Sequence, residues 1–303
     1  MTLAGVTLPV TTPFDPKSGD IAPVSFRDNL RAWLDAGVQG LVIAGSTGEA
    51  PLLDEDEVVQ LVEWARDVVP PERTLVAGTG AEATRAVIRL SRAVAAVGAD
   101  AVLVRPPAYY RGRMDAETVR RHYEAVADAI PVPVILYNVP QFVPLEITPG
   151  LLAELGSHPN VAGIKDSTGD LKNLGALLDA APPDCSVLVG AGSRLYAALE
   201  MGAAGGIVAV GCLAPRETVE VYEQFRAGAM GPAGAVQGRL TPVHNRIVRE
   251  LGVAGVKHGL DLLGLDGGLP RPPLRPLDEK SRRTVQKELK KAGLVSEQAS
   301  ASG

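Results

Sequence analysis

Short runs of apolar and β-branched residues recur along the chain, and each is followed by a stretch that reads as helix. Most runs are continuously apolar, such as LVIA, AVLV and VILY, which is typical of parallel strands covered by helices. Successive runs begin about 20 to 35 residues apart, the length of one βα unit. The expected strands are residues 5–12, 40–44, 74–78, 101–104, 134–137, 161–165, 186–189 and 206–210.

Helices are expected between these strands, several of them bounded by a glycine such as Gly37 or by a proline such as Pro131. Eight alternating units in succession predict the α/β class and a (β/α)8 TIM barrel, with a doubly wound open sheet as the alternative. The expected barrel helices are residues 24–36, 54–69, 81–97, 115–130, 148–155, 171–180, 193–201 and 215–227.

The alternation of strands and helices stops after the eighth unit. Three further helices are expected at 233–251, 253–263 and 278–292, and the proline-rich segment LPRPPLRPL at 269–277 should be extended. The pattern therefore divides the chain into a catalytic barrel (1–228), a C-terminal helical domain (229–293) and a flexible tail (294–303).

Composition excludes several classes of protein. The 303 residues carry a net charge of −5, which argues against a nucleic-acid or anionic-membrane binder, and no apolar run approaches the length of a membrane span. There is no signal-peptide pattern, and the two cysteines form no disulfide framework, so we expect a cytoplasmic protein. The four histidines never occur at HxH or HExxH spacing, so no metal site is expected.

Candidate chemistry lies where strands end, because barrel active sites are built there. The second strand runs into GSTGEAP at 45–51, where two glycines let backbone N–H groups converge beside Ser46 and Thr47. Such a turn forms a nest suited to a carboxylate, or it simply caps the helix that follows.

Lys165 ends the sixth strand, where the alternation of VAGIK places it at or near the barrel interior. Burial lowers the pKa of a lysine, and the neutral amine attacks ketones, so Lys165 is a candidate for Schiff-base formation. A surface lysine, or one paired with Asp166, is the alternative. Tyr137 ends the fifth strand, and its hydroxyl could shuttle the protons that imine formation requires.

Three motifs occur together at these strand ends: GSTGEAP at 45–51, YNVP at 137–140 and GIKDSTGD at 163–170. On these motifs the chain resembles the dihydrodipicolinate synthase/N-acetylneuraminate lyase superfamily of pyruvate-dependent class I aldolases, from about residue 6 to residue 293. The resemblance implies that Lys165 forms an imine with pyruvate or another 2-oxo acid. It also implies that Tyr137 shuttles protons and that Ser46 relays them.

Further site residues follow from the same resemblance. Ser46 and Thr47 would bind the substrate carboxylate through their backbone, and Gly190 and Ile207 would line the pyruvate pocket. Tyr109 would reach the site from a neighbouring subunit, or Tyr110 would if the loop is shifted by one residue. The resemblance further implies a homotetramer built as a dimer of dimers, and catalysis with no metal or organic cofactor.

The choice among members of the superfamily depends on a few positions. Phe142 stands where dihydrodipicolinate synthases usually carry an arginine that holds the aldehyde substrate, which puts that activity in doubt. The stretches AYYRGRM at 108–114, HPNVAGIKDSTGD at 158–170 and GVAGVKHGLDLLGLDGG at 252–268 look most like 4-hydroxy-2-oxoglutarate aldolases. Thr47 and Arg105 depart from that group, in which asparagine and threonine are usual.

We therefore expect cleavage of 4-hydroxy-2-oxoglutarate to pyruvate and glyoxylate, or the reverse condensation. Arg105, or Arg111 or Arg113 in the same loop, is hypothesised to hold a second acid group of the substrate, since guanidinium groups bind carboxylates bidentately. The loop could equally be a solvated basic surface. The alternative activities are dihydrodipicolinate synthase, a sugar-acid aldolase or dehydratase, and a non-catalytic barrel that binds 2-oxo acids.

Overall fold

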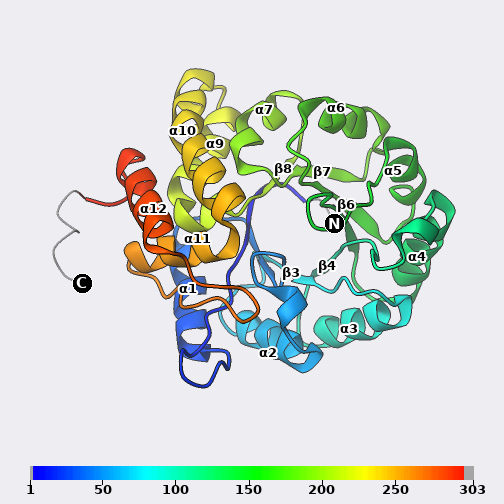
Figure 1. The fold of residues 1–303 in the computed structure, drawn as a ribbon. Coiled ribbons are helices and arrows are strands. Elements are labelled where there is room, and N and C mark those ends of the chain that lie inside the picture. Colours follow the sequence, from blue (N-terminus) through cyan, green and yellow to red (C-terminus); the bar gives the residue numbers. More distant parts are fainter. Residues whose placement is uncertain (1–2, 297–303) are drawn as a thin grey trace.

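Eight parallel strands close into a barrel in the computed structural model, which describes residues 3–296 (Figure 1). Each strand pairs with the next in sequence, and β8 pairs with β1, so the open-sheet alternative is wrong. The strands are β1 (Gly5–Pro9), β2 (Gly40–Ile43), β3 (Thr74–Gly78), β4 (Ala101–Val104), β5 (Val134–Asn138), β6 (Val161–Asp166), β7 (Ser186–Val189) and β8 (Gly205–Ile207).

Helices surround the barrel, and apolar side chains fill the space between them and the strands. A second apolar cluster fills the barrel itself and includes Val42, Val76, Ile135 and Tyr137. The surrounding helices are α1 (Pro23–Asp35), α2 (Glu55–Arg66), α3 (Thr84–Ala96), α4 (Ala116–Ala129), α5 (Pro149–Leu155), α6 (Leu171–Ala180), α7 (Leu195–Glu200), α8 (Val210–Leu213) and α9 (Pro215–Arg226).

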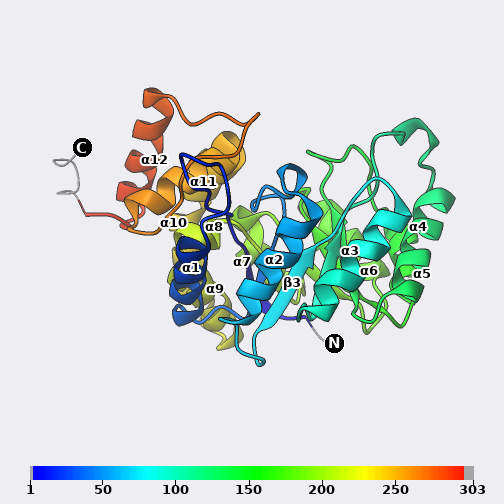
Figure 2. The same cartoon turned by 90° about the horizontal axis from the view of Figure 1, so that it is seen from below.

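The helical segment after the barrel lies at one end of it. It comprises α10 (Met230–Val243), a π-helix η4 (His244–Arg249), α11 (Glu250–Leu262) and α12 (Glu279–Lys291). Figure 2 shows α11 and α12 at the end opposite the N-terminus, which is the end where the strands finish. The C-terminal helices therefore stand beside the mouth at which the candidate residues were expected.

Three expected elements differ from the structure. The first strand was expected to reach residue 12 but ends at Pro9, and Thr12 instead bonds the turn that follows β2. The eighth was expected to reach residue 210 but ends at Ile207, where the chain soon turns into α8. The helix expected at 233–251 becomes a π-helix two residues after Pro242, which lacks the N–H that would continue the α-helical bonding.

The division into barrel, helical domain and tail stays a prediction. Leu294 and Val295, at the start of the expected tail, pack partly buried against the main core, and residues 297–303 lie outside the described part. Within residues 3–296, no helix has the length and apolar character needed to span a membrane.

Candidate active site

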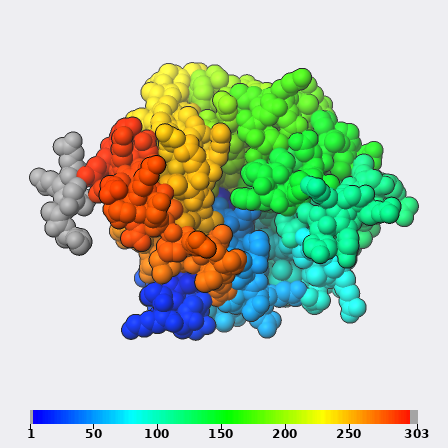
Figure 3. Space-filling view, viewed as in Figure 1, coloured from blue at the N-terminus to red at the C-terminus, as the bar shows by residue number. Residues whose placement is uncertain are grey.

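A cavity of about 650 Å³ opens at the carboxyl ends of the strands, between the barrel and the C-terminal helices. It corresponds to the hollow between the orange and yellow helices and the green segments in Figure 3. Six residues expected at the site from the sequence line it: Ser46, Thr47, Tyr137, Lys165, Gly190 and Ile207. The structure thus brings together side chains from four different strand ends.

Lys165 and Tyr137 are neighbours in the barrel because β5 and β6 pair with these two residues in register. Both side chains are buried, and the Lys165 amine lies 4.3 Å from the centre of the Tyr137 ring. This contact is a cation–π interaction. Lys165 forms no ion pair with any residue of the described chain, and the oxygens of Asp166 are bound instead by Asn138 and Thr168. The structure thus favours an inward-facing lysine over a surface lysine or one paired with Asp166.

Tyr137 is placed to exchange protons with its neighbours. Its hydroxyl lies 3.5 Å from the Ser46 hydroxyl. Burial tends to raise the pKa of Tyr137, but the charge of Lys165 and hydrogen bonds with Ser46, Ser167 and Lys165 outweigh it and lower this pKa below its usual value. A tyrosine that ionises more readily is a better proton shuttle near neutral pH.

The turn after β2 holds its backbone ready for an anion. Thr12 donates a 2.8 Å hydrogen bond to the Gly48 carbonyl, and the amides of Gly48 and Ala50 bond back to the Gly45 carbonyl. The amides of Ser46 and Thr47 donate to no group in residues 3–296, and both residues line the cavity. Two free N–H groups at a cavity wall are suited to bind an anion such as a carboxylate. The end of the same turn also starts a short 3-10 helix at Ala50, so it has the capping role that was the alternative.

Gly190 is required by close packing around the lysine strand. Its amide donates a 2.6 Å hydrogen bond to the Asp166 carbonyl, and a Cβ at this position would lie 1.9 Å from the Ser167 hydroxyl oxygen. Ser167 also lines the cavity and bonds to Tyr137. The sequence analysis assigned Ser167 no role, although it lies two residues after Lys165 and therefore on the same side of the extended chain.

A buried ion pair fixes the turn after β2 to the C-terminal helices. Glu49 follows that turn in a left-handed conformation (φ 61°), and its carboxylate lies 2.6 Å from the Lys257 amine, with both side chains fully buried. Lys257 also donates to the Leu269 carbonyl at 2.9 Å, and the Arg271 amide donates to Glu49 at 2.8 Å. The Arg271 side chain forms a bidentate pair with Glu57 on α2.

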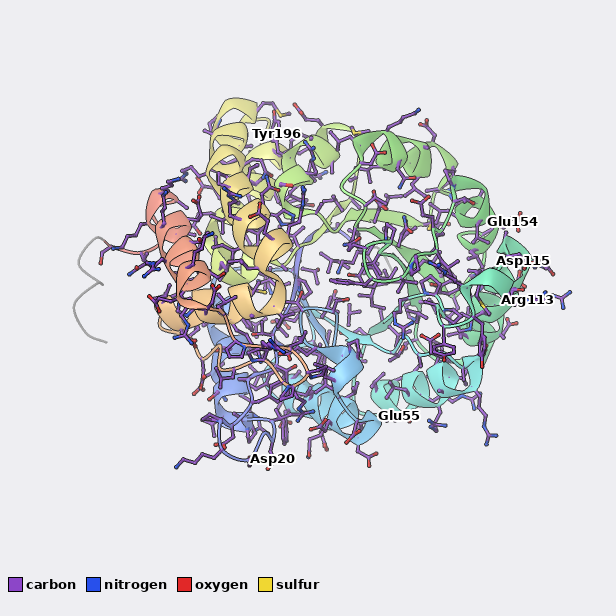
Figure 4. All side chains as sticks on the ribbon, viewed as in Figure 1. Asp20, Glu55, Arg113, Asp115, Glu154 and Tyr196 are labelled. Atoms are coloured by element: carbon purple, nitrogen blue, oxygen red, sulfur yellow. The ribbon has the colours of Figure 1, made fainter. Side chains whose placement is uncertain are left out.

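Four expected residues lie outside this cavity or at its rim. Tyr109 is 80% exposed and does not line the cavity formed by the described chain. Arg105 does not line it either, because its guanidinium is held 2.9 Å from Glu82, whose carboxylate also accepts the Tyr109 amide. Phe142 is 69% exposed but contributes to the cavity wall. Figure 4 places Arg113 at the outer edge of the molecule.

Arg105 therefore lies paired with Glu82 and outside the cavity of the single chain, and its hypothesised role stays a prediction. The arginines that do line the cavity are Arg194 and Arg249, to which the sequence assigned no role. No group of three or more His, Cys, Asp or Glu side chains arranged for a metal occurs in the part of the chain that the structure describes.

The mouth of the closed barrel holds a buried amine, a tyrosine hydroxyl and a serine hydroxyl. These groups are typical of carbon–carbon lyases of the aldolase class. The model of the dihydrodipicolinate synthetase family matches residues 2–292, and the chain belongs to that family. This match confirms the family resemblance from which the site residues were predicted.

Individual relatives agree with this assignment. The chain is 33% identical to the 4-hydroxy-tetrahydrodipicolinate synthase of Nitrobacter hamburgensis, over 94% of this chain and 95% of that protein. It is 37% identical to an uncharacterized DapA-like lyase of Halobacterium salinarum, over 97% and 95% of the two chains. The chloride-inhibited dihydrodipicolinate synthase of Acinetobacter baumannii, solved with pyruvate, superposes with a TM-score of 0.91 at 32% identity, covering 97% of this chain and 100% of that one.

Proposed function

We propose that the protein is a class I pyruvate aldolase whose imine forms on Lys165. The observation that carries the proposal is the buried amine of Lys165, which forms no ion pair within residues 3–296 and lies 4.3 Å from the centre of the Tyr137 ring. The same cavity also presents two free backbone amides. Pure binding of a 2-oxo acid requires the amides but no amine. The amine therefore favours catalysis over a non-catalytic binding barrel.

The residues divide the reaction among them. The amides of Ser46 and Thr47 hold the C1 carboxylate, which directs the C2 carbonyl toward Lys165. The neutral amine adds to C2, and Tyr137 donates the proton with which the carbinolamine oxygen leaves as water. Ser46, 3.5 Å from Tyr137, stays hydrogen-bonded to the resulting phenolate, which remains deprotonated for the next step.

The protonated imine then draws electrons from the C3–C4 bond. Loss of the proton from the C4 hydroxyl to the Tyr137 phenolate breaks this bond, releases an aldehyde and leaves an enamine on Lys165. Protonation of the enamine carbon and addition of water release pyruvate. The imine itself is the electron sink, so the proposed reaction takes neither a metal nor an organic cofactor.

We propose 4-hydroxy-2-oxoglutarate as the substrate, with glyoxylate as the aldehyde. Phe142 supports this choice, because it lines the cavity at the position where dihydrodipicolinate synthases usually carry an arginine that holds the aldehyde substrate. The second candidate is 4-hydroxy-tetrahydrodipicolinate synthase, which condenses pyruvate with aspartate semialdehyde. This second candidate is supported by relatives that carry that name, such as the protein of Nitrobacter hamburgensis.

We also propose a homotetramer built as a dimer of dimers, in which Tyr109 completes the proton relay of a partner subunit. Tyr109 and Tyr110 expose 80% and 70% of their surface and pack edge to face with their rings 5.0 Å apart. Glu82 holds their loop through the amides of Ala108 and Tyr109. A pair of large exposed aromatic rings on a fixed loop is suited to burial against a second copy.

Borohydride reduction in the presence of pyruvate, followed by peptide mass spectrometry, tests the central step. We expect a reduced pyruvyl adduct on Lys165 in the wild-type chain and none in Lys165→Arg, with Lys172→Arg as a control that keeps the adduct. A folded wild-type protein that gives no adduct between pH 6 and 9 would refute the proposal. Steady-state assays with glyoxylate and aspartate semialdehyde then separate the two candidate activities.

A further inference from the structure

The cavity carries a charge that binding of pyruvate alone does not explain. Its wall contains the Lys165 amine and the guanidinium groups of Arg194 and Arg249, and none of the described residues that line it is Asp or Glu. Lys165 and the amides of Ser46 and Thr47 account for the 2-oxo acid end of a substrate. The side chains of Arg194 and Arg249 form no hydrogen bond or ion pair within residues 3–296, so both guanidinium groups are available to a ligand.

The two arginines come from segments that contact each other. Arg194 ends the 3-10 helix η3 (Gly192–Arg194) after β7, and Arg249 ends the π-helix η4, which packs against η3. Gln237 of α10 holds this arrangement, because it donates to the Gly192 carbonyl at 3.1 Å and accepts from the Tyr196 amide at 3.0 Å. Arg194 is therefore fixed to the same helical segment that leads to Arg249.

The π-helix turns several polar side chains toward the cavity. His244, Asn245, Val248 and Arg249 all line it, and the i to i+5 bonding of a π-helix places residues at these spacings on one face. The face of the π-helix that lines the cavity therefore contributes polar side chains to it, Arg249 among them.

We infer that Arg194 and Arg249 bind a second acid group, at the end of the substrate remote from the imine, and so select dianionic substrates. The inference rests on the proposed function and deepens it, because it names the substrate class of the same cavity: a 2-oxo acid that carries a second carboxylate. Guanidinium groups bind carboxylates through paired hydrogen bonds, and a wall without acidic residues offers them no competing partner. This assigns to Arg194 of the barrel and Arg249 of the C-terminal segment the role first hypothesised for Arg105.

The test compares two 2-oxo acids that differ at the remote end only. Apparent affinity for imine formation is measured from the concentration dependence of borohydride trapping, with 2-oxoglutarate, with 2-oxovalerate, which lacks the second carboxylate, and with pyruvate. We expect the wild-type chain to prefer 2-oxoglutarate to 2-oxovalerate by about tenfold, as removal of a charge-assisted bond would suggest. Because the interaction is ionic, the preference should shrink as salt is raised.

Variants test which residues cause the preference for 2-oxoglutarate over 2-oxovalerate. In Arg194→Gln/Arg249→Gln the affinities for 2-oxoglutarate and 2-oxovalerate should differ by no more than about twofold, while the affinity for pyruvate is unchanged. Arg249→Lys should retain part of the preference for 2-oxoglutarate. Arg216→Gln, which removes an exposed arginine of α9 outside the cavity, is the charge-matched control and should behave as wild type. Arg105→Gln tests the earlier hypothesis directly and is also expected to keep the preference.

Three outcomes decide the inference. Equal affinity for the two acids in the wild-type chain overturns it, and so does a preference that survives in the double variant. If no pyruvyl adduct forms at all, the proposed function fails separately, and calorimetric titration with glutarate then decides the charge inference. Glutarate binding that the double variant abolishes supports the arginine site, and binding that is absent or unaffected overturns it.

Discussion

Lys257→Met is the perturbation whose effect the structure defines most sharply. It removes the amine that lies 2.6 Å from Glu49 and leaves that carboxylate fully buried, with the Arg271 amide as its remaining donor. Removing one partner of a buried ion pair costs about 3–5 kcal/mol of unfolding free energy. Because one hydrogen bond to Glu49 survives, we expect a loss near the lower limit, about 3 kcal/mol.

Equilibrium unfolding in urea at pH 7 measures this loss. The double variant Glu49→Gln/Lys257→Met should recover most of the stability, because it no longer buries a charge without a partner. Arg283→Met breaks an exposed pair with Glu279 on α12 and is the control, expected to leave the urea midpoint unchanged. A loss of less than about 1 kcal/mol in the single variant, or a double variant no more stable than the single one, would refute the reasoning.

The same variant should also weaken substrate binding. Glu49 is fixed by Lys257 and directly follows the turn whose Ser46 and Thr47 amides form the carboxylate nest. Release of Glu49 loosens these amides, so the KM for pyruvate should rise more than kcat falls. Lys257→Arg, which keeps the charge, should restore KM in part.

Three further predictions concern the catalytic groups and the buried histidines. Gly190→Ala places a Cβ 1.9 Å from the Ser167 oxygen, so Ser167 must move away from Tyr137. Trapping of pyruvate by the folded variant should slow about tenfold, and the melting temperature should fall because overpacking costs about 1–3 kcal/mol. A normal trapping rate would contradict this. Tyr137→Phe should lower kcat about 10²- to 10⁴-fold with pyruvate affinity retained, and a smaller loss measured in steady-state assays would exclude Tyr137 as the shuttle. Burial lowers the pKa of His122 and His244 to about 4, whereas the pKa of each is near 6.5 in the unfolded chain. The unfolded chain therefore binds protons first, and the free energy of unfolding should fall as pH drops from 6.5 to 4. His122→Asn should make this pH dependence weaker in urea titrations.

The barrel could be predicted because its cause is local. Each strand is a short apolar run with its own helix after it, and the period of the pattern fixes the number of units. The inward direction of Lys165 was predictable for the same reason, since alternation along a single strand decides it. The resemblance added the roles of Tyr137 and Ser46, which two different strands bring within 3.5 Å.

The remote half of the cavity could not be predicted in this way. Whether Arg105 is free or paired depends on Glu82, which lies 23 residues away in another βα unit. Arg249 reaches the cavity because a π-helix packs over the barrel mouth, and the sequence of that segment reads as an ordinary helix. Ion pairs and helix docking depend on packing between residues far apart in the sequence. The local periodicity of apolar residues carries no information about such contacts.

The Glu49–Lys257 pair has a consequence for synthesis of the protein. Lys257 leaves the ribosome 208 residues after Glu49 (257 − 49), and Arg271 follows 14 residues later (271 − 257). At about 5–20 residues per second this delay lasts roughly 10–40 s. During that time the strands can pair and the lysine strand can form, but the acidic residue behind the carboxylate nest has no counter-ion. The buried ion pair that fixes this turn to the rest of the protein therefore forms only after the last helices have emerged.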